Sequence, residues 1–184
     1  MLVDPSYNTF EEKYLKHQAQ VAWTSIVADL ETPVSAMLKI AEDLPNSFLL
    51  ESVEGGEVRG RFSVIGLDPD LIWRCRKGQA EINRTPHREN KFEVDSLPPI
   101  ESLRALMRQS EMPDTGDLPP MAAGLFGYFS YDMIREIEDI PDTNKPIVET
   151  DDALLLRPSL IAIFDRLKDS ITLVTQVRPE EWDN

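Results

Sequence analysis

Cysteine is almost absent from the sequence, because Cys75 is the only one in 184 residues. No disulfide can therefore form within the chain. Cys75 alternates with Leu71 and Trp73 in a period-2 pattern, which places its thiol on the apolar side of a predicted strand. We interpret it as a packed thiol rather than a reactive one.

Basic residues are also scarce. The chain has 19 Lys and Arg against 33 Asp and Glu, which gives a formal net charge of −14. No basic block offsets this excess, so we expect no binding to nucleic acid or to an anionic membrane surface. The acidity itself indicates solubility rather than a particular fold.

Histidine occurs only at His17 and His87, in a predicted surface helix and a charged loop. Neither has neighbours at metal-ligand spacing. The sequence also lacks a Gly-rich phosphate loop, a nucleophile elbow and a Cys/His pair. From its residues alone, the chain predicts no catalytic or metal centre.

Long hydrophobic runs are missing too. No apolar stretch approaches the roughly 20 residues that cross a bilayer, and residues 1–5 lack the basic and apolar regions of a secretory signal. We therefore expect a cytoplasmic protein without a membrane partner. With 41% hydrophobic residues, the chain can bury one sizeable core.

What is present is a series of short β-rich segments. An apolar run at 48–50 passes into Glu51 and Ser52, and a returning strand follows at 61–66 after a loose loop. Two more strands are predicted at 71–76 and 80–82, separated by Gly78. These four segments predict an antiparallel meander, which places a carboxylate and a hydroxyl at the mouth of a sheet.

Other segments predict helices and a second hairpin. Thr32-Pro33 and Pro98-Pro99 are typical helix starts. Periodicity predicts buried faces made by Met37, Leu38, Ile40 and Ala41 in the first helix, and by Ile100, Leu103, Leu106 and Met107 in the second. We also predict a helix at 10–20, a strand at 21–28, a Gly-containing strand at 121–130, a short helix at 131–137 and a hairpin of 160–164 with 171–177. The predicted fold class is α+β, a mainly antiparallel sheet with a few packed helices.

An ordered set of motifs resembles the amino-terminal region of component I of anthranilate synthase, a chorismate-utilising enzyme family. The motifs are Thr32-Pro33-Val34-Ser35-Ala36, Leu49-Leu50-Glu51-Ser52, Gly55-Gly56, Arg61-Phe62-Ser63, Gly66-Leu67-Asp68-Pro69, Gly124-Leu125-Phe126-Gly127-Tyr128 and Tyr131-Asp132. They span most of the chain, and their order makes the resemblance specific.

The resemblance implies an allosteric pocket for L-tryptophan. Ser52 is the residue carried over most directly, with Glu51 as an acceptor for the ammonium group, Arg61 as a partner of the carboxylate and Leu50 lining the indole slot. From spacing alone, an alternative stays open: Glu51 and Ser52 could simply close the hairpin by bonding its backbone.

The resemblance also implies what surrounds the chain. Residues 1–178 would form the regulatory domain, and 179–184 would begin a linker to an absent chorismate-binding domain. That domain would hold Mg²⁺, whereas this chain would need no cofactor and would be inactive alone. A glutamine amidotransferase subunit would supply ammonia. The alternatives are the same domain of aminodeoxychorismate synthase component I, or a structural module that docks the glutaminase.

Overall fold

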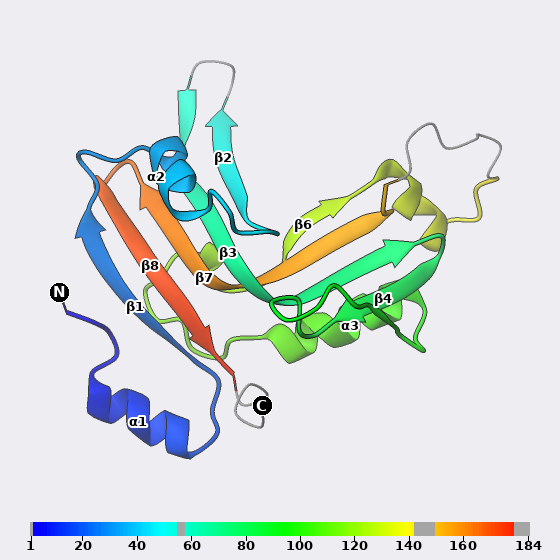
Figure 1. Cartoon of the computed structure of the whole chain (residues 1–184), viewed down its shortest axis with the longest axis horizontal. Helices are drawn as coiled ribbons and strands as arrows, with labels where there is room; N and C mark the ends of the chain where they lie inside the picture. Colours follow the sequence, from blue (N-terminus) through cyan, green and yellow to red (C-terminus); the bar gives the residue numbers. More distant parts are fainter. Residues whose placement is uncertain (1, 55–57, 142–149, 179–184) are drawn as a thin grey trace. The chain divides into compact units, whose positions relative to one another are not determined.

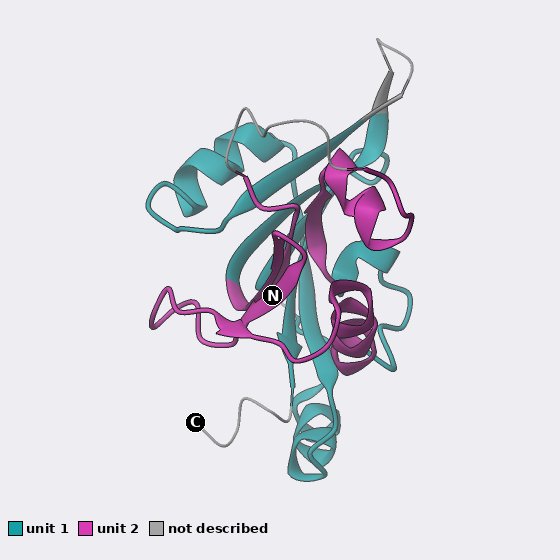
Figure 2. Ribbon diagram, turned by 90° about the vertical axis from the view of Figure 1, so that its right-hand side faces the viewer, with its two compact units in different colours: residues 1–68, 112–124, 158–184 teal, residues 69–111, 125–157 magenta. Residues whose placement is uncertain are grey.

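The computed structural model describes residues 2–54, 58–141 and 150–178, with side chains described outside 53–59. The expected linker at 179–184 lies outside the described residues. The chain divides into two compact units, which Figure 2 colours separately. Unit 1 comprises Met1–Asp68, Met112–Gly124 and Pro158–Asn184, and unit 2 comprises Pro69–Glu111 and Leu125–Arg157.

Antiparallel strands form the main part of both units (Figure 1). Their order is β1-β8-β7-β3-β4-β5, with β2 also pairing with β3 and β6 with β7. The strands are β1 (Gln20–Val27), β2 (Phe48–Glu54), β3 (Val58–Arg76), β4 (Gln79–Asn83), β5 (Glu93–Val94), β6 (Phe126–Phe129), β7 (Ala153–Asp165) and β8 (Ser170–Val177). The predicted antiparallel α+β fold is confirmed. The two middle strands of the predicted meander are parts of one 19-residue strand, β3.

Unit 1 carries helices α1 (Tyr7–Leu15) and α2 (Pro33–Ile40) and the short helix η1 (Pro120–Ala122). Thr32 caps α2 as predicted, because its side chain accepts from the Ser35 amide and Ser35 bonds back to the Thr32 amide. Helix α1 ends earlier than predicted, and His17 adopts a positive φ of 51° before β1 begins.

The predicted buried face of α2 is only half right. Met37 and Ala41 pack with Ile65, Phe164 and Ile171 in the core of unit 1. Leu38 is 67% exposed and Ile40 is 42% exposed. An eight-residue helix that rests on a sheet through Met37 turns its next residue about 100° away, so adjacent apolar residues cannot all be buried.

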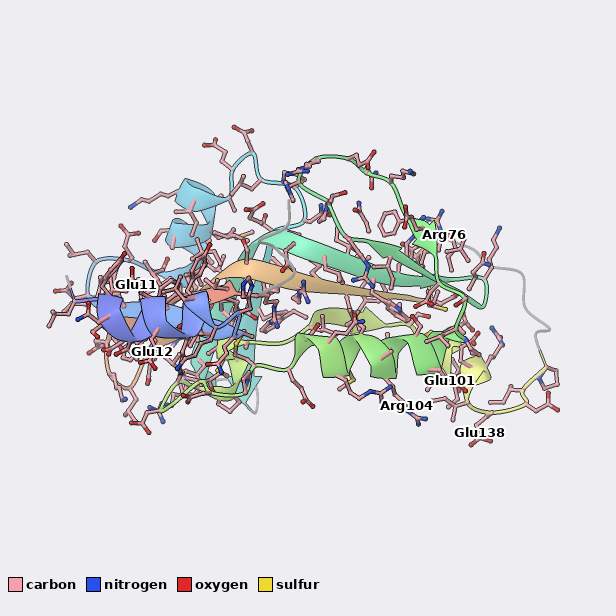
Figure 3. All side chains as sticks on the ribbon, turned by 90° about the horizontal axis from the view of Figure 1, so that it is seen from below. Glu11, Glu12, Arg76, Glu101, Arg104 and Glu138 are labelled. Atoms are coloured by element: carbon pink, nitrogen blue, oxygen red, sulfur yellow. The ribbon has the colours of Figure 1, made fainter. Side chains whose placement is uncertain are left out.

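Unit 2 contains helix α3 (Pro99–Ser110) and the short helix η2 (Tyr131–Glu136). Its core includes Leu71, Trp73, Cys75, Leu106 and Met133, with Ile100, Leu103 and Leu125 packed against it. Met107 is 57% exposed, so that part of the predicted helix face is wrong. Figure 3 shows Arg104 on the side of α3 that faces away from the strands.

Two close contacts fix unit 2. The Trp73 indole donates to the Ser102 hydroxyl at 2.9 Å, and Ser102 donates to Asp95 at 2.6 Å. Gly127 lies against the β7 backbone so closely that a Cβ there would stand 1.9 Å from the Leu154 carbonyl oxygen. Glycine within a strand often marks such a close approach of two backbones. The strand predicted at 121–130 is shorter in the structure, where β6 covers Phe126–Phe129.

Among the described residues, no helix has the length and apolar content that a membrane crossing requires.

Cys75 should be unreactive while the protein is folded. Burial, and then the Glu136 and Asp152 carboxylates, raise the pKa of its thiol from 9.0 to about 11, which cuts the thiolate fraction at neutral pH about a hundredfold. A colorimetric thiol reagent should therefore react slowly with the native chain and rapidly in denaturant. Equal rates in both conditions would contradict this burial.

Candidate functional site

The hairpin of β2 and β3 has an irregular register at the predicted site. Glu51 pairs with Ser63 and Val53 pairs with Arg59. Between these pairs β2 contributes Ser52 alone, whereas β3 contributes residues 60–62. Such bulges redirect side chains and interrupt the ladder of backbone hydrogen bonds. Ser52 and Arg61 therefore lie where the hairpin departs from regular pairing, whereas Leu50 and Glu51 pair regularly with Val64 and Ser63.

Ser52 is exposed, and its side chain lies over Gly60. A Cβ at Gly60 would stand 2.3 Å from the Ser52 hydroxyl oxygen. Within the described residues, the hydroxyl makes no hydrogen bond, so it does not tie down the hairpin backbone described here. Its donor and its acceptor both remain open to solvent or a ligand.

Glu51 is held by an arginine from another part of unit 1. Arg166 Nη2 lies 3.1 Å from Glu51 Oε1, and the two side chains are 27% and 36% exposed. The same nitrogen lies 3.4 Å from the Ser63 hydroxyl. The second oxygen of Glu51 has no partner in the described part of the chain, so the carboxylate keeps acceptor capacity.

Arg61 forms an ion pair with Asp165, the residue that precedes Arg166 in the chain. Its Nε and Nη2 donate to the two Asp165 oxygens at 3.0 and 2.7 Å, and its guanidinium lies 4.7 Å from the centre of the Phe62 ring. The Asp165 carboxylate is buried and also accepts from the Leu167 amide at 3.0 Å. The hydrogen bond from Arg61 lowers the pKa of Asp165, and the same contact raises the pKa of Arg61.

Leu50 supplies apolar surface on the Ser52 side of the hairpin, whereas Glu51 points to the opposite side. It is 48% exposed, although its partner across the hairpin, Val64, is buried. Side chains two apart on a strand share a face, so the alternation places Leu50 on the same side of β2 as Ser52. A hydroxyl and an open apolar surface thus lie together.

The structure adds Asp165 and Arg166 to the four predicted residues. The sequence places them in a turn between two β-rich segments, which predicts a hairpin connection and nothing more. Arg61 and Asp165 are 104 residues apart along the chain. No local pattern reports such a pairing. The described residues contain no group of three or more His, Cys, Asp or Glu able to hold a metal ion.

Comparison with known proteins identifies the relatives of the chain. It is 46% identical over 170 residues to anthranilate synthase component 1 of Cereibacter sphaeroides, covering 92% of this chain and 34% of that protein. It is 39% identical over 160 residues to anthranilate synthase component 1 of Thermus thermophilus, covering 85% and 32%. The chain is thus related to anthranilate synthase component 1. The resemblance predicted from its motifs is confirmed.

A solved structure agrees on the fold. Anthranilate synthase component I from Streptococcus pneumoniae TIGR4 matches 85% of this chain and 32% of that one, with a TM-score of 0.56 at 21% identity. No family model matches the chain. The chain spans about a third of the length of the curated relatives it matches.

The Arg61–Asp165 pair should make stability fall in acid. The pKa of Asp165 is below its ordinary value of 3.8 in the folded chain, so the unfolded chain takes up its proton first as pH falls. The contribution is therefore complete above about pH 5 and is lost progressively below about pH 4.

Urea unfolding of the natural chain and of Asp165→Asn measures this loss. The difference in their free energies of unfolding should shrink between about pH 5 and pH 3. Asp95, whose pKa is lowered chiefly by the Ser102 hydrogen bond, is common to both proteins and cancels in the difference. A constant difference across this range would remove the ion pair as its cause.

Proposed function

We propose that this chain is the regulatory part of an anthranilate synthase component I and senses L-tryptophan through the β2–β3 hairpin. Residues 1–178 would form that regulatory region. The observation that carries the proposal is the exposed Ser52 hydroxyl beside the exposed Leu50 side chain on one face of β2, next to the irregular point of the hairpin, with Glu51 between them in the chain.

The chemistry of an amino acid fits these groups. Its ammonium needs an acceptor, and the second oxygen of Glu51 is available for it. Ser52 can donate to the ligand carboxylate or accept from its ammonium. Leu50 provides one wall for an indole ring. Arg61 would contact the carboxylate only while also bonding Asp165, or after leaving it.

The full-length protein would then convert chorismate to anthranilate and pyruvate, using ammonia supplied by a glutamine amidotransferase subunit. Its chorismate-binding domain would hold Mg²⁺. Tryptophan would inhibit by binding one arrangement of this region and that domain better than the other, which shifts the population toward the inactive arrangement.

Two other functions would use the same fold. In the first alternative, the chain would be the equivalent domain of aminodeoxychorismate synthase component I. In the second, it would be a structural module that docks a glutaminase. The relatives described above are named anthranilate synthase component 1, which favours the anthranilate pathway over the first alternative. The open polar groups at Glu51 and Ser52 favour a ligand site over the second.

Ser52→Ala in the full-length enzyme should raise the tryptophan concentration that gives half-inhibition, by about tenfold for one lost hydrogen bond in a closed site. Gly60→Ala should act in the same direction, because its methyl group would displace the Ser52 side chain. Ser47→Ala, in the loop before β2, is the matched control and should retain both rate and inhibition. Unchanged inhibition in Ser52→Ala would remove Ser52 from the site.

The isolated 184-residue chain should bind tryptophan weakly and make no anthranilate. We expect this result because the pocket would also draw contacts from the chorismate-binding domain, which would supply the catalytic groups as well. Calorimetry and a fluorescence assay with chorismate, Mg²⁺ and ammonia test the two parts. Affinity equal to that of the full-length enzyme would contradict a shared pocket, and anthranilate formation would contradict the assignment of catalysis elsewhere.

A further inference from the structure

Two consecutive residues of one turn hold the two charged residues of the candidate site. Asp165 closes a two-pronged ion pair with Arg61, and Arg166 bonds Glu51 and Ser63. The Arg166 amide also donates to the Arg61 carbonyl at 3.0 Å. The β7–β8 turn therefore contacts both strands of the β2–β3 hairpin, all within unit 1.

The turn is itself well defined. Asp165 pairs with Ser170 at the end of the β7–β8 ladder, its side chain caps the Leu167 amide, and its carbonyl accepts from the Lys168 amide at 3.3 Å. Asp169 closes the turn with a positive φ of 48°. A turn that these contacts already order can hold a partner side chain in place, because little further conformational entropy of the turn is lost when the pair forms.

Arg166 is poorly explained by stability alone. Its Nη1 is buried and makes no hydrogen bond in the described part of the chain. A buried donor without a partner costs stability, and a half-exposed ion pair to Glu51 gains little. What the arrangement does provide is orientation: one oxygen of Glu51 is anchored by Arg166, and the other has no hydrogen-bond partner among the described residues.

We propose that Asp165 and Arg166 are positioning residues of the ligand site, so that the β7–β8 turn sets how strongly the hairpin responds to an amino-acid ligand without contacting that ligand. The inference rests on the proposed function. Arg166 acts through Glu51, and Asp165 acts through Arg61.

A cation at the position of the Arg166 Nη2 atom is needed for this role. One guanidinium nitrogen reaches both Glu51 and Ser63, while the delocalised charge remains close to the carboxylate. A lysine retains the charge but carries it on a flexible four-carbon stem as a compact ammonium, so it should restore only part of the effect. Lys168 is an exposed cation two residues further along the same turn. Its side chain makes no hydrogen bond or ion pair among the described residues, and it serves as the control position.

The test is a double-mutant cycle in the full-length enzyme. Arg166→Gln should raise the tryptophan concentration for half-inhibition about three- to tenfold, relative to the uninhibited rate of the same variant. Arg166→Lys should give a smaller rise, and Lys168→Gln none. In a Glu51→Gln background, Arg166→Gln should have no further effect, because the group through which it acts is already changed.

Three outcomes separate the possibilities. If Arg166→Gln has the same effect in the natural enzyme and in the Glu51→Gln background, the substitution loosens the hairpin in general. That result would overturn the positioning role. No effect of Arg166→Gln, in an enzyme whose inhibition is relieved by Glu51→Gln and Ser52→Ala, would also overturn it while leaving the proposed function standing. If Glu51→Gln and Ser52→Ala leave inhibition unchanged, the proposed function fails and the positioning role fails with it.

Discussion

The candidate site depends on the ion pair between Arg61 and Asp165. Asp165 is buried at the end of β7, and its carboxylate would be costly there without the guanidinium and the Leu167 amide that it accepts from. Because Arg61 lies in the irregular stretch of β3 opposite Ser52, satisfying Asp165 also fixes where this stretch runs. The need to neutralise Asp165 at the end of β7 thus helps to determine the geometry of the β2–β3 hairpin, which is far away in the sequence.

Local features of the sequence predicted the elements well. Thr32 and the Pro98-Pro99 pair gave the starts of α2 and α3, and Gly78, with its positive φ of 72°, separates β3 from β4 as expected. The predictions of buried helix residues failed in part, because burial depends on tertiary contacts that sequence periodicity does not report. Leu38 and Met107 belong to apolar patterns, but both side chains are exposed in the folded chain.

Part of the candidate site could also be predicted from local features of the sequence. Glu51 and Ser52 follow an apolar run, so their strand could be inferred from the chain itself. The predicted place at the mouth of the sheet is wrong, because β2 and its pairing with β3 continue past them to Glu54 and Val58. The register shift at Ser52 arises from pairing between strands, and the contacts of Arg166 join residues 115 apart. Family resemblance pointed to Ser52 and Glu51, whereas only the folded chain connects Glu51 with the β7–β8 turn.

The exposure of the site residues separates ligand response from folding. Ser52 and Leu50 are exposed and lie outside the buried core, so replacing them removes little apolar burial. The buried residues beneath them, such as Ile65 and Phe164, hold the sheet together and cannot vary as freely. Between these layers lie the half-buried charges of Arg61 and Arg166. Because they contact the site and the strand ends together, substitutions there would change ligand response and stability at once, which makes them the place where the two properties are coupled.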